Sequence, residues 1–485
     1  MVRVAAYVGL SVRRRRAVHQ RAGDVIEAWD ESVPIADPVS ALAFHATGSG
    51  IPERIVKWNH EAAEAAIAKG AMEIAESLLR DVVGAQRAVG AEPAACCATH
   101  RRLAFAAERA GHPESALNAL IQAVRVADGS EQGLIAVDRT RVLEKLGRYR
   151  SALVVTARAL KSCDDSETVG HLRLARATIR NFLGDTKECL SLSRELLRDF
   201  ENVADRRLLA QAHLLCEWCC MSLGLPERAE HERAALTLLT ELDDSLGLAN
   251  LYLNVGASAG QDFRVFDAVS NFRASSECYQ RAGDVVGAAL ADNNLAEVLT
   301  LQHKLDAAED LLTNARRVTE AANYPHGTLA TVSGLSRIAA WRGNTDEALR
   351  LQTEALAGFR ELRADDFVVD SLVRLVEIHV IAGDSSAALS VAAEAFSIFA
   401  RRGEMAVIEA SLARLTARAL VLAGRQTEAR AMFERATDLA SRDGSLYEIA
   451  LAYMGIARLD GDEVRLSAAL AQLSELGVDA PPPGS

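Results

Sequence analysis

An internal repeat of about 40 residues constrains this chain more than any other feature of its sequence, because periods of this length indicate repeat architectures. Glycines that could end a helix recur at nearly equal intervals, at Gly70, Gly111, Gly147, Gly184, Gly224, Gly343, Gly383, Gly424 and Gly461. Three such intervals separate Gly224 from Gly343. That gap predicts two further junctions, near Phe263 and His303, where another residue replaces the glycine.

Small residues recur at a fixed distance from these junctions. Five residues past each junction, nine of eleven positions are Ala and a tenth is Cys: Ala75, Ala116, Ala152, Cys189, Ala229, Ala268, Ala308, Ala348, Ala388, Ala429 and Leu466. Small side chains let two helices approach closely. Between junctions, apolar residues recur at spacings of three and four residues, which is typical of amphipathic helices. A Gly in the left-handed conformation commonly ends a helix. The pattern therefore predicts helical hairpins that pack on one another.

These residues resemble the tetratricopeptide repeat, which has a small residue late in its first helix, a Gly at the turn and two Ala in its second helix. The resemblance covers roughly residues 55–478. It implies an all-α fold, a tetratricopeptide-type α-solenoid whose superhelix contains about eleven helical hairpins. Because most spacings are near 40 and not 34, we expect longer helices than usual.

The sequence predicts three segments. Residues 1–50 form an N-terminal helical cap, residues 51–478 form the repeat solenoid, and residues 479–485 form a short disordered tail that contains three prolines.

The N-terminal segment carries a second resemblance. Arg13 to Arg16, His19, His45 and the Ala62 to Ala66 run resemble a junction found in large bacterial signalling ATPases. These include class III adenylate and guanylate cyclase fusions and LuxR-type ATP-dependent regulators. There an Arg-rich helix with a His closes the last helical subdomain of the ATPase region. The resemblance implies that this chain is the sensor arm of such a system, because the sequence has no G-x-x-x-x-G-K-[ST] phosphate loop and we expect no helix-turn-helix output module.

Charge and hydropathy exclude some partners. The net charge is −12 and the pI is about 5.5, so most of the surface should repel nucleic acid, and we expect no direct nucleic-acid partner. No apolar run reaches the ~18–20 residues that span a bilayer, so we expect no membrane insertion. The eight cysteines are irregularly spaced, which favours a reduced, cytoplasmic setting. The resemblance to bacterial signalling ATPases implies a bacterial protein.

No group of residues predicts catalysis. The strongest candidate is Cys216-x-x-Cys219-Cys220, which lies inside a predicted helix. A zinc site needs four converging ligands, and only His213 lies nearby, so buried structural thiols are the favoured interpretation. We expect no catalytic, metal or cofactor site, and we expect that the protein is not an enzyme.

The first helix of each hairpin should line a concave groove that binds a protein or peptide ligand. The inward positions of the repeat predict these groove residues: Arg101, Phe105, Arg141, His171, Asn181, Gln211, Trp218, Asn250, Asn293, Arg337, Trp341, Arg414 and Arg418. The alternative for any one of them is packing against a neighbouring repeat.

The sequence thus predicts a non-enzymatic protein- or peptide-binding scaffold, or the sensor module of a bacterial signalling system. The alternative is the regulatory arm of a multidomain ATP-dependent transcriptional regulator or nucleotidyl cyclase whose catalytic domains lie outside this chain.

Overall fold

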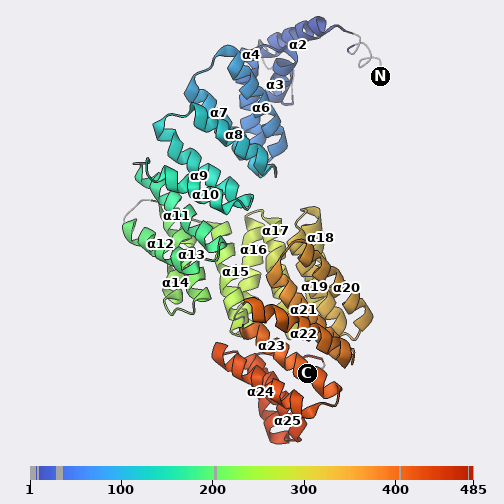
Figure 1. The fold of residues 1–485 in the computed structure, drawn as a ribbon. Helices are drawn as coiled ribbons and strands as arrows, with labels where there is room; N and C mark the ends of the chain where they lie inside the picture. The colour runs from blue at the N-terminus through green and yellow to red at the C-terminus, as the bar shows by residue number, and fades with distance from the viewer. Residues whose placement is uncertain are drawn as a thin grey trace. The chain divides into compact units, whose positions relative to one another are not determined.

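The chain forms two compact units, Met1–His231 and Glu232–Ser485, each a stack of antiparallel helices (Figure 1). The computed structural model describes residues 7, 10–28, 36–200, 205–402, 406–478 and 480–483. Within these ranges every regular element is a helix and none is a strand. None of the described helices is long and apolar enough to cross a membrane.

The helices of unit 1, with the last one extending into unit 2, are α2 (Val12–Glu27), α3 (Pro38–Ser49), α4 (Pro52–Arg54), the π-helical turn η1 (Ile55–Asn59), α5 (His60–Ala68), α6 (Met72–Val89), α7 (Pro93–Arg109), α8 (Pro113–Val126), α9 (Gly129–Lys145), α10 (Tyr149–Ala159), α11 (Ser166–Phe182), α12 (Thr186–Asp199), α13 (Arg206–Ser222) and α14 (Arg228–Glu241).

The helices of unit 2 are α15 (Ser245–Gln261), α16 (Val265–Arg281), α17 (Val285–Leu301), α18 (Leu305–Ala321), α19 (Pro325–Trp341), α20 (Thr345–Glu361), α21 (Asp365–Ile381), α22 (Ser385–Arg402), α23 (Ala406–Leu422), α24 (Gln426–Asp443), α25 (Leu446–Asp460) and α26 (Glu463–Glu475).

All eleven predicted junctions are turns with a left-handed residue. The nine glycines have φ between 63° and 86°. Phe263 and His303, the two positions without Gly, adopt the same conformation with φ of 52° and 55°. At Gly343 the turn is closed by two backbone hydrogen bonds, from Gly343 to Ala340 (2.9 Å) and from Asn344 to Ala339 (2.9 Å), the pattern that satisfies the last carbonyls of a helix. The predicted tetratricopeptide-type α-solenoid, with eleven described hairpins, is confirmed.

A second set of left-handed turns joins successive hairpins in unit 2. From Asp243 to Gly383 a left-handed residue occurs every 20 positions, at Asp243, Phe263, Gly283, His303, Asn323, Gly343, Arg363 and Gly383. Each helix from α15 to α21 has 17 residues, and a short linker joins it to its neighbour. Two helices and two linkers therefore make one period of the repeat, and the expectation of longer helices is confirmed.

The small residues lie where the helices touch. Nine of the eleven positions five residues past a junction have no exposed surface, Ala348 among them. Ala229 differs, because it is exposed. In the other ten hairpins the second helix begins two residues after the left-handed residue, whereas α14 begins four residues after Gly224. Ala229 is thus in the first turn of its helix, and Ala235 is buried instead.

The C-terminal hairpin of unit 2 packs against the first helices of the same unit. Tyr447 of α25 stacks on Phe263, with 4.2 Å between ring centroids, and joins one apolar cluster with Ala259, Leu295 and Leu299. The Ala480 carbonyl lies 3.1 Å from Nε2 of His303. Unit 2 therefore has an interior that its own C-terminal segment fills.

The predicted cap at residues 1–50 contains α2 and α3, which pack together, and its boundary stays a prediction. In the predicted tail, residues 479, 484 and 485 lie outside the described residues.

Replacing Ala348 with Trp should force α19 and α20 apart, because this position has no exposed surface. We expect a loss of about 1–3 kcal/mol from overpacking. Thermal and urea unfolding measure the loss, and the exposed Ala357 on the same helix gives the matched control Ala357→Trp. Equal stability of the two variants would show that the repeat frame is misplaced.

Replacing Arg363 with Gly should stabilise unit 2 by about 0.5–1 kcal/mol, because its left-handed φ of 54° costs a residue with a Cβ roughly 1–2 kcal/mol and the extra backbone freedom of Gly offsets part of that gain. In the control Thr353→Gly, at an exposed helical position, urea unfolding should show the opposite sign. Destabilisation by Arg363→Gly would contradict this account of the turn.

Candidate functional site

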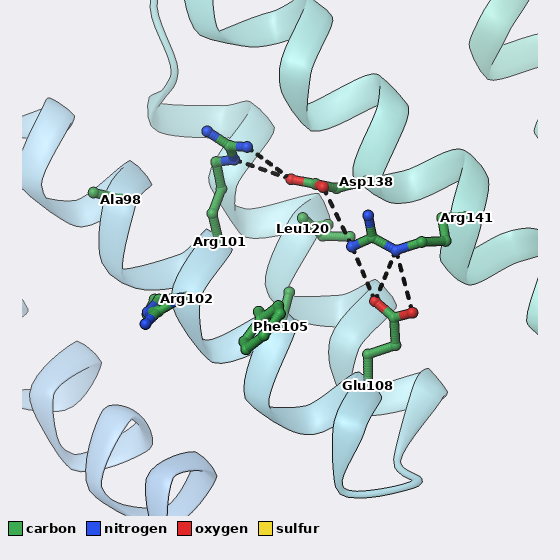
Figure 2. A pocket seen from close by; sticks show the side chains of 9 residues that line it. Ala98, Arg101, Arg102, Phe105, Glu108, Leu120, Asp138 and Arg141 are labelled. Atoms are coloured by element: carbon green, nitrogen blue, oxygen red, sulfur yellow. Dashed lines mark hydrogen bonds and ion pairs between the residues drawn. The ribbon is translucent and has the colours of Figure 1, made fainter. Parts of the chain in front are cut away.

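Three of the predicted groove residues meet in one pocket of unit 1. Arg101 and Phe105 of α7 and Arg141 of α9 line a half-open pocket of about 320 Å³ (Figure 2). Its other lining residues are Ala98, Arg102, Ala104, Glu108, Leu120 and Asp138. The pocket therefore lies on the first helices of two successive hairpins, α7/α8 and α9/α10, where a groove was expected.

Helical periodicity brings these side chains together. Arg101, Phe105 and Glu108 are separated by four and three residues, so they share one face of α7. Asp138, Arg141 and Lys145 are separated by three and four residues and share one face of α9. The buried Leu120 of α8 closes the floor of the pocket.

Ion pairs link the two faces across the pocket. Arg101 donates through Nε (3.1 Å) and Nη2 (2.9 Å) to Oδ2 of Asp138. Arg141 donates through Nε and Nη2 to Oε2 of Glu108 at 3.1 and 3.0 Å, and its Nη2 is 3.3 Å from Asp138. Nζ of Lys145 is 2.7 Å from the other Glu108 oxygen. These contacts fix both guanidinium planes.

Glu108 is held in its charged form. Its side chain is only 6% exposed, and burial alone would raise its pKa. The hydrogen bonds from Arg141 and Lys145 outweigh burial, so the pKa of Glu108 lies below its ordinary value. A carboxylate in this state is an acceptor and not a proton donor.

Phe105 supplies the apolar part of the pocket. The guanidinium groups of Arg102 and Arg109 lie 5.1 and 5.5 Å from the centre of its ring. Arg102 in turn pairs with Glu64 through two nitrogens. Among the described residues no carboxylate pairs with Arg109.

The sequence did not single out Glu108, Asp138 and Lys145. Their spacing in the sequence could have indicated them. Glu108 follows Arg101 by seven residues, Asp138 precedes Arg141 by three residues, and Lys145 follows Arg141 by four. On a helix these spacings place opposite charges on the face that carries the predicted residues.

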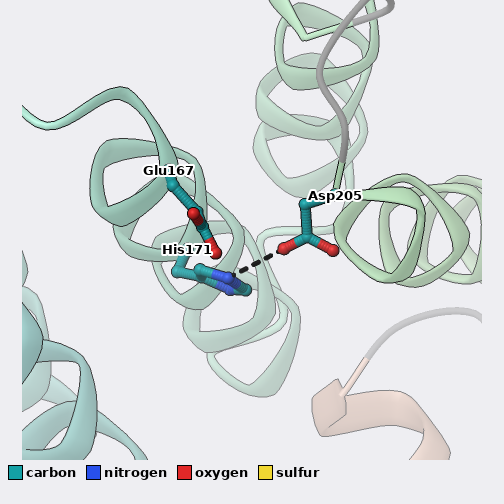
Figure 3. A group of neighbouring side chains, drawn as sticks. All are labelled: Glu167, His171 and Asp205. Carbon is teal, nitrogen blue, oxygen red and sulfur yellow. Dashed lines mark ion pairs between the residues drawn. The ribbon is translucent and has the colours of Figure 1, made fainter.

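The predicted His171 lies in a different group in unit 1. Its Nε2 is 3.0 Å from Oδ2 of Asp205, and Glu167 lies one turn before it on α11 (Figure 3). The ligand atoms of these three residues lie within 4.8 Å of one another, so a divalent cation could be held here. The arrangement also serves the fold, because the other Asp205 oxygen caps α13 by accepting from the backbone of Arg207 and Leu208.

The remaining predicted residues of unit 1 do not converge on the pocket. Asn181 is half-buried near the end of α11, and Gln211 is exposed on α13. Trp218 packs against a buried cluster that contains Cys189, Cys216, Cys219 and Cys220. Those thiols have no exposed surface, and burial raises the pKa of Cys216 to about 12. Their predicted burial is confirmed, and Cys216 is a poor nucleophile.

In unit 2 several predicted residues form ion pairs or hydrogen bonds with other residues of the same unit. Arg337 pairs with Glu297 (3.3 Å) and Glu377 (3.2 Å), and Trp341 donates from Nε1 to Glu377 (3.1 Å). Arg374 joins the same network, with Nη1 3.1 Å from Glu297. Burial alone would raise the pKa of Glu297, but Arg374 and Arg337 hold it below its ordinary value.

Arg414 and Glu448 form the most enclosed ion pair of unit 2. Nε of Arg414 donates to Glu448 at 2.6 Å, and the two side chains are 8% and 5% exposed. Glu448 belongs to α25, so the C-terminal hairpin supplies the counter-charge. The inner face of unit 2 is therefore neutralised from within.

Three predicted residues of unit 2 remain. Asn250 accepts a hydrogen bond from the Tyr279 hydroxyl at 2.6 Å. Asn293 is half-buried on α17. Burial, with the nearby Arg458 and Arg414, lowers the pKa of Arg418 to about 10.

Comparisons with known proteins agree with this architecture. Residues 287–361 match the tetratricopeptide repeat model. No curated protein sequence matches the chain.

Three solved structures share the fold. One is a Rap protein complexed with competence and sporulation factor, at 13% identity and a TM-score of 0.54, which covers 72% of this chain and 99% of its own. The apo form of RapI has 10% identity, a TM-score of 0.50 and coverage of 71% and 97%. A signal transduction ATPase with numerous domains, the protein PH0952 from Pyrococcus horikoshii, has a tetratricopeptide repeat sensor. It has 12% identity, a TM-score of 0.50 and coverage of 95% and 74%. At these identities the likeness concerns the fold.

The Arg414–Glu448 pair gives a direct test of its structural role. Arg414→Met should cost about 3–5 kcal/mol, because it leaves Glu448 buried without a counter-charge. Adding Glu448→Met should recover most of that loss. The matched control is Arg350→Met, at a pair with Glu347 that is largely exposed, where about 0–1 kcal/mol is expected. Urea unfolding measures all three, and an unchanged midpoint for Arg414→Met would contradict the assigned burial.

Proposed function

We propose that this protein is a non-enzymatic binding scaffold or sensor of a bacterial signalling system, and that it holds a protein or peptide segment in the pocket of unit 1. The observation that carries the proposal is the pocket itself, where Arg101, Phe105 and Arg141 meet on adjacent inner helices and remain partly exposed. An aromatic ring beside oriented guanidinium groups is a typical anchor for a peptide.

The lining of the pocket favours binding over catalysis. It contains arginines, two carboxylates and apolar residues, and it contains no Ser, Cys, His or Lys that could act as a nucleophile. Glu108 is stabilised as an anion by its neighbours, so it is unsuited to donating a proton. In unit 2 the predicted groove residues Arg337, Trp341 and Arg414 are less exposed than Arg101 and Arg141 and are paired within the unit.

The structural neighbours support the same proposal. A Rap protein with this fold is complexed with competence and sporulation factor, and PH0952 carries its repeats as a sensor. Our proposal gives this chain the same kind of role, with the cytoplasm as its compartment and with no direct contact to nucleic acid.

A second candidate function is the regulatory arm of an ATP-dependent transcriptional regulator or a nucleotidyl cyclase. The observation in its favour is a contact between two residues of the N-terminal resemblance. Nδ1 of His19 and Nδ1 of His45 lie 3.0 Å apart. Burial lowers the pKa of His45, and the nearby His19 lowers it further. The contact joins α2 to α3 at the start of the repeats. A nucleotide-binding domain encoded upstream and acting with this chain would support this candidate.

A selection with a random peptide display library on the full chain tests the binding proposal. We expect peptides to be enriched and their affinity to fall about tenfold or more in Phe105→Ala, since a central aromatic anchor contributes at least ~1.4 kcal/mol. Phe266→Ala is the matched control, because Phe266 is 71% exposed in unit 2. Failure to enrich any peptide, or an equal loss in both variants, would count against the proposal.

A further inference from the structure

We infer that the pocket of unit 1 selects an acidic segment, one that places a carboxylate at Arg101 and Arg141 and an apolar side chain on Phe105. This inference rests on the proposed function, because it assigns the ligand chemistry of the same pocket. It depends on three observations. These are the balance of charge around the pocket, the arginine nitrogens that donate to no described residue, and the carboxylate oxygens that already have a cationic partner.

Positive charge exceeds negative charge around the pocket. The charged lining residues and their direct ion-pair partners are four cations, Arg101, Arg102, Arg141 and Lys145, and three carboxylates, Glu64, Glu108 and Asp138. Arg109 beside Phe105 adds a further cation, and Glu144, which interacts electrostatically with Lys145 and Arg141, adds a further carboxylate. This local excess stands out in a chain whose net charge is −12. An anionic group would restore the balance.

Each of the two arginines that face the pocket has one nitrogen that donates no hydrogen bond to the described residues. Arg101 uses Nε and Nη2, and Arg141 uses the same two nitrogens, so Nη1 of each donates to none of the described residues. In Figure 2 the unused nitrogen of Arg101 points away from Asp138, and that of Arg141 points away from Glu108. A carboxylate that arrives there gains charge-assisted hydrogen bonds from guanidinium groups already held in place.

Every oxygen of Glu108 and Asp138, in contrast, already has a cationic partner. One Glu108 oxygen accepts from Arg141 (3.2 Å) and lies 2.7 Å from Lys145, and the other accepts twice from Arg141. Both Asp138 oxygens have an arginine within 3.3 Å. A basic ligand would compete with these cations for the carboxylate oxygens, whereas an acidic ligand would not. The pocket therefore discriminates by charge as well as by shape.

Phe105 sets the second requirement. Its ring is half-buried, with Arg102 and Arg109 beside it, and the apolar Ala98 and Leu120 also line the pocket. An apolar side chain can cover the ring and exclude water from the neighbouring ion pairs, which strengthens them. The ligand is thus a peptide segment with Asp or Glu close to a Leu-like or aromatic residue.

The composition of the selected peptides tests this inference separately from the proposed function. We expect Asp or Glu to be enriched within a few positions of an apolar residue. Enrichment of Lys- or Arg-rich or uncharged peptides would overturn the acidic assignment while leaving the binding proposal standing. No enrichment at all would be the failure of the binding proposal.

Two variants should then shift the affinity for an enriched acidic peptide in opposite directions. Arg101→Gln should weaken binding about tenfold, because it removes a cation. Asp138→Asn should strengthen binding several-fold, because it removes a negative charge that lies beside both arginines and repels the ligand carboxylate. Arg350→Gln on α20 of unit 2 is the control and should change nothing.

A third variant covers the case in which Asp138→Asn does not fold. Lys145→Gln replaces a side chain that is 52% exposed, and it should weaken binding about threefold by reducing the excess of positive charge. Titration calorimetry gives the affinities, and circular dichroism confirms the fold of each variant. Weakening by both Arg101→Gln and Asp138→Asn, or no change on Lys145→Gln, would contradict the inference.

Discussion

The left-handed turn that recurs at equal spacing from Asp243 to Gly383 is the constraint on which the repeat structure depends. Each of these turns follows a helix, and the next helix begins two residues later. Because the turns are equally spaced, alternate helices begin at equivalent positions of the repeat. The small residue of each helix therefore contacts the neighbouring helix at an equivalent position. Gly256 shows how close this approach is, since a Cβ there would come within 2.8 Å of the Phe272 ring.

Half of these turns could be predicted from the sequence and half could not. The junctions within hairpins were visible because most of them use Gly, and equal spacing then placed Phe263 and His303. The turns between hairpins include Asp243, Asn323 and Arg363. Asp and Asn tolerate the left-handed region, so two of these carried a weak signal, whereas Arg363 carried none. Ala229 was placed wrongly because α14 begins two residues late, and spacing alone does not reveal such a delay.

The candidate site was predictable up to the point where long-range packing decides. The repeat frame placed Arg101, Phe105 and Arg141 on inner helices, and the structure brings them into one pocket. The same frame placed Arg337 and Arg414 on inner helices of unit 2. There Tyr447 and Glu448, which come later in the chain than either arginine, enter the interior and take up the space and the charge. No local pattern distinguishes an inner face that stays open from one that another segment fills.

The two units thus use the same repeat in different ways. In unit 1 the ion pairs of Arg101 and Arg141 position the two guanidinium groups at a partly exposed surface. In unit 2 the ion pairs of Arg337, Arg374 and Arg414 are enclosed, and the Arg414–Glu448 pair joins the C-terminal hairpin to α23. Buried pairs of this kind contribute specificity of packing more than net stability.

Hydrogen exchange of the full chain, measured with and without an enriched peptide, tests the central claim most directly. If the ligand site is the pocket of unit 1, protection should rise in α7 to α9, residues 93–145, while exchange in unit 2 stays unchanged. Protection centred on α19 to α25 of unit 2, with α7 to α9 unaffected, would contradict the account.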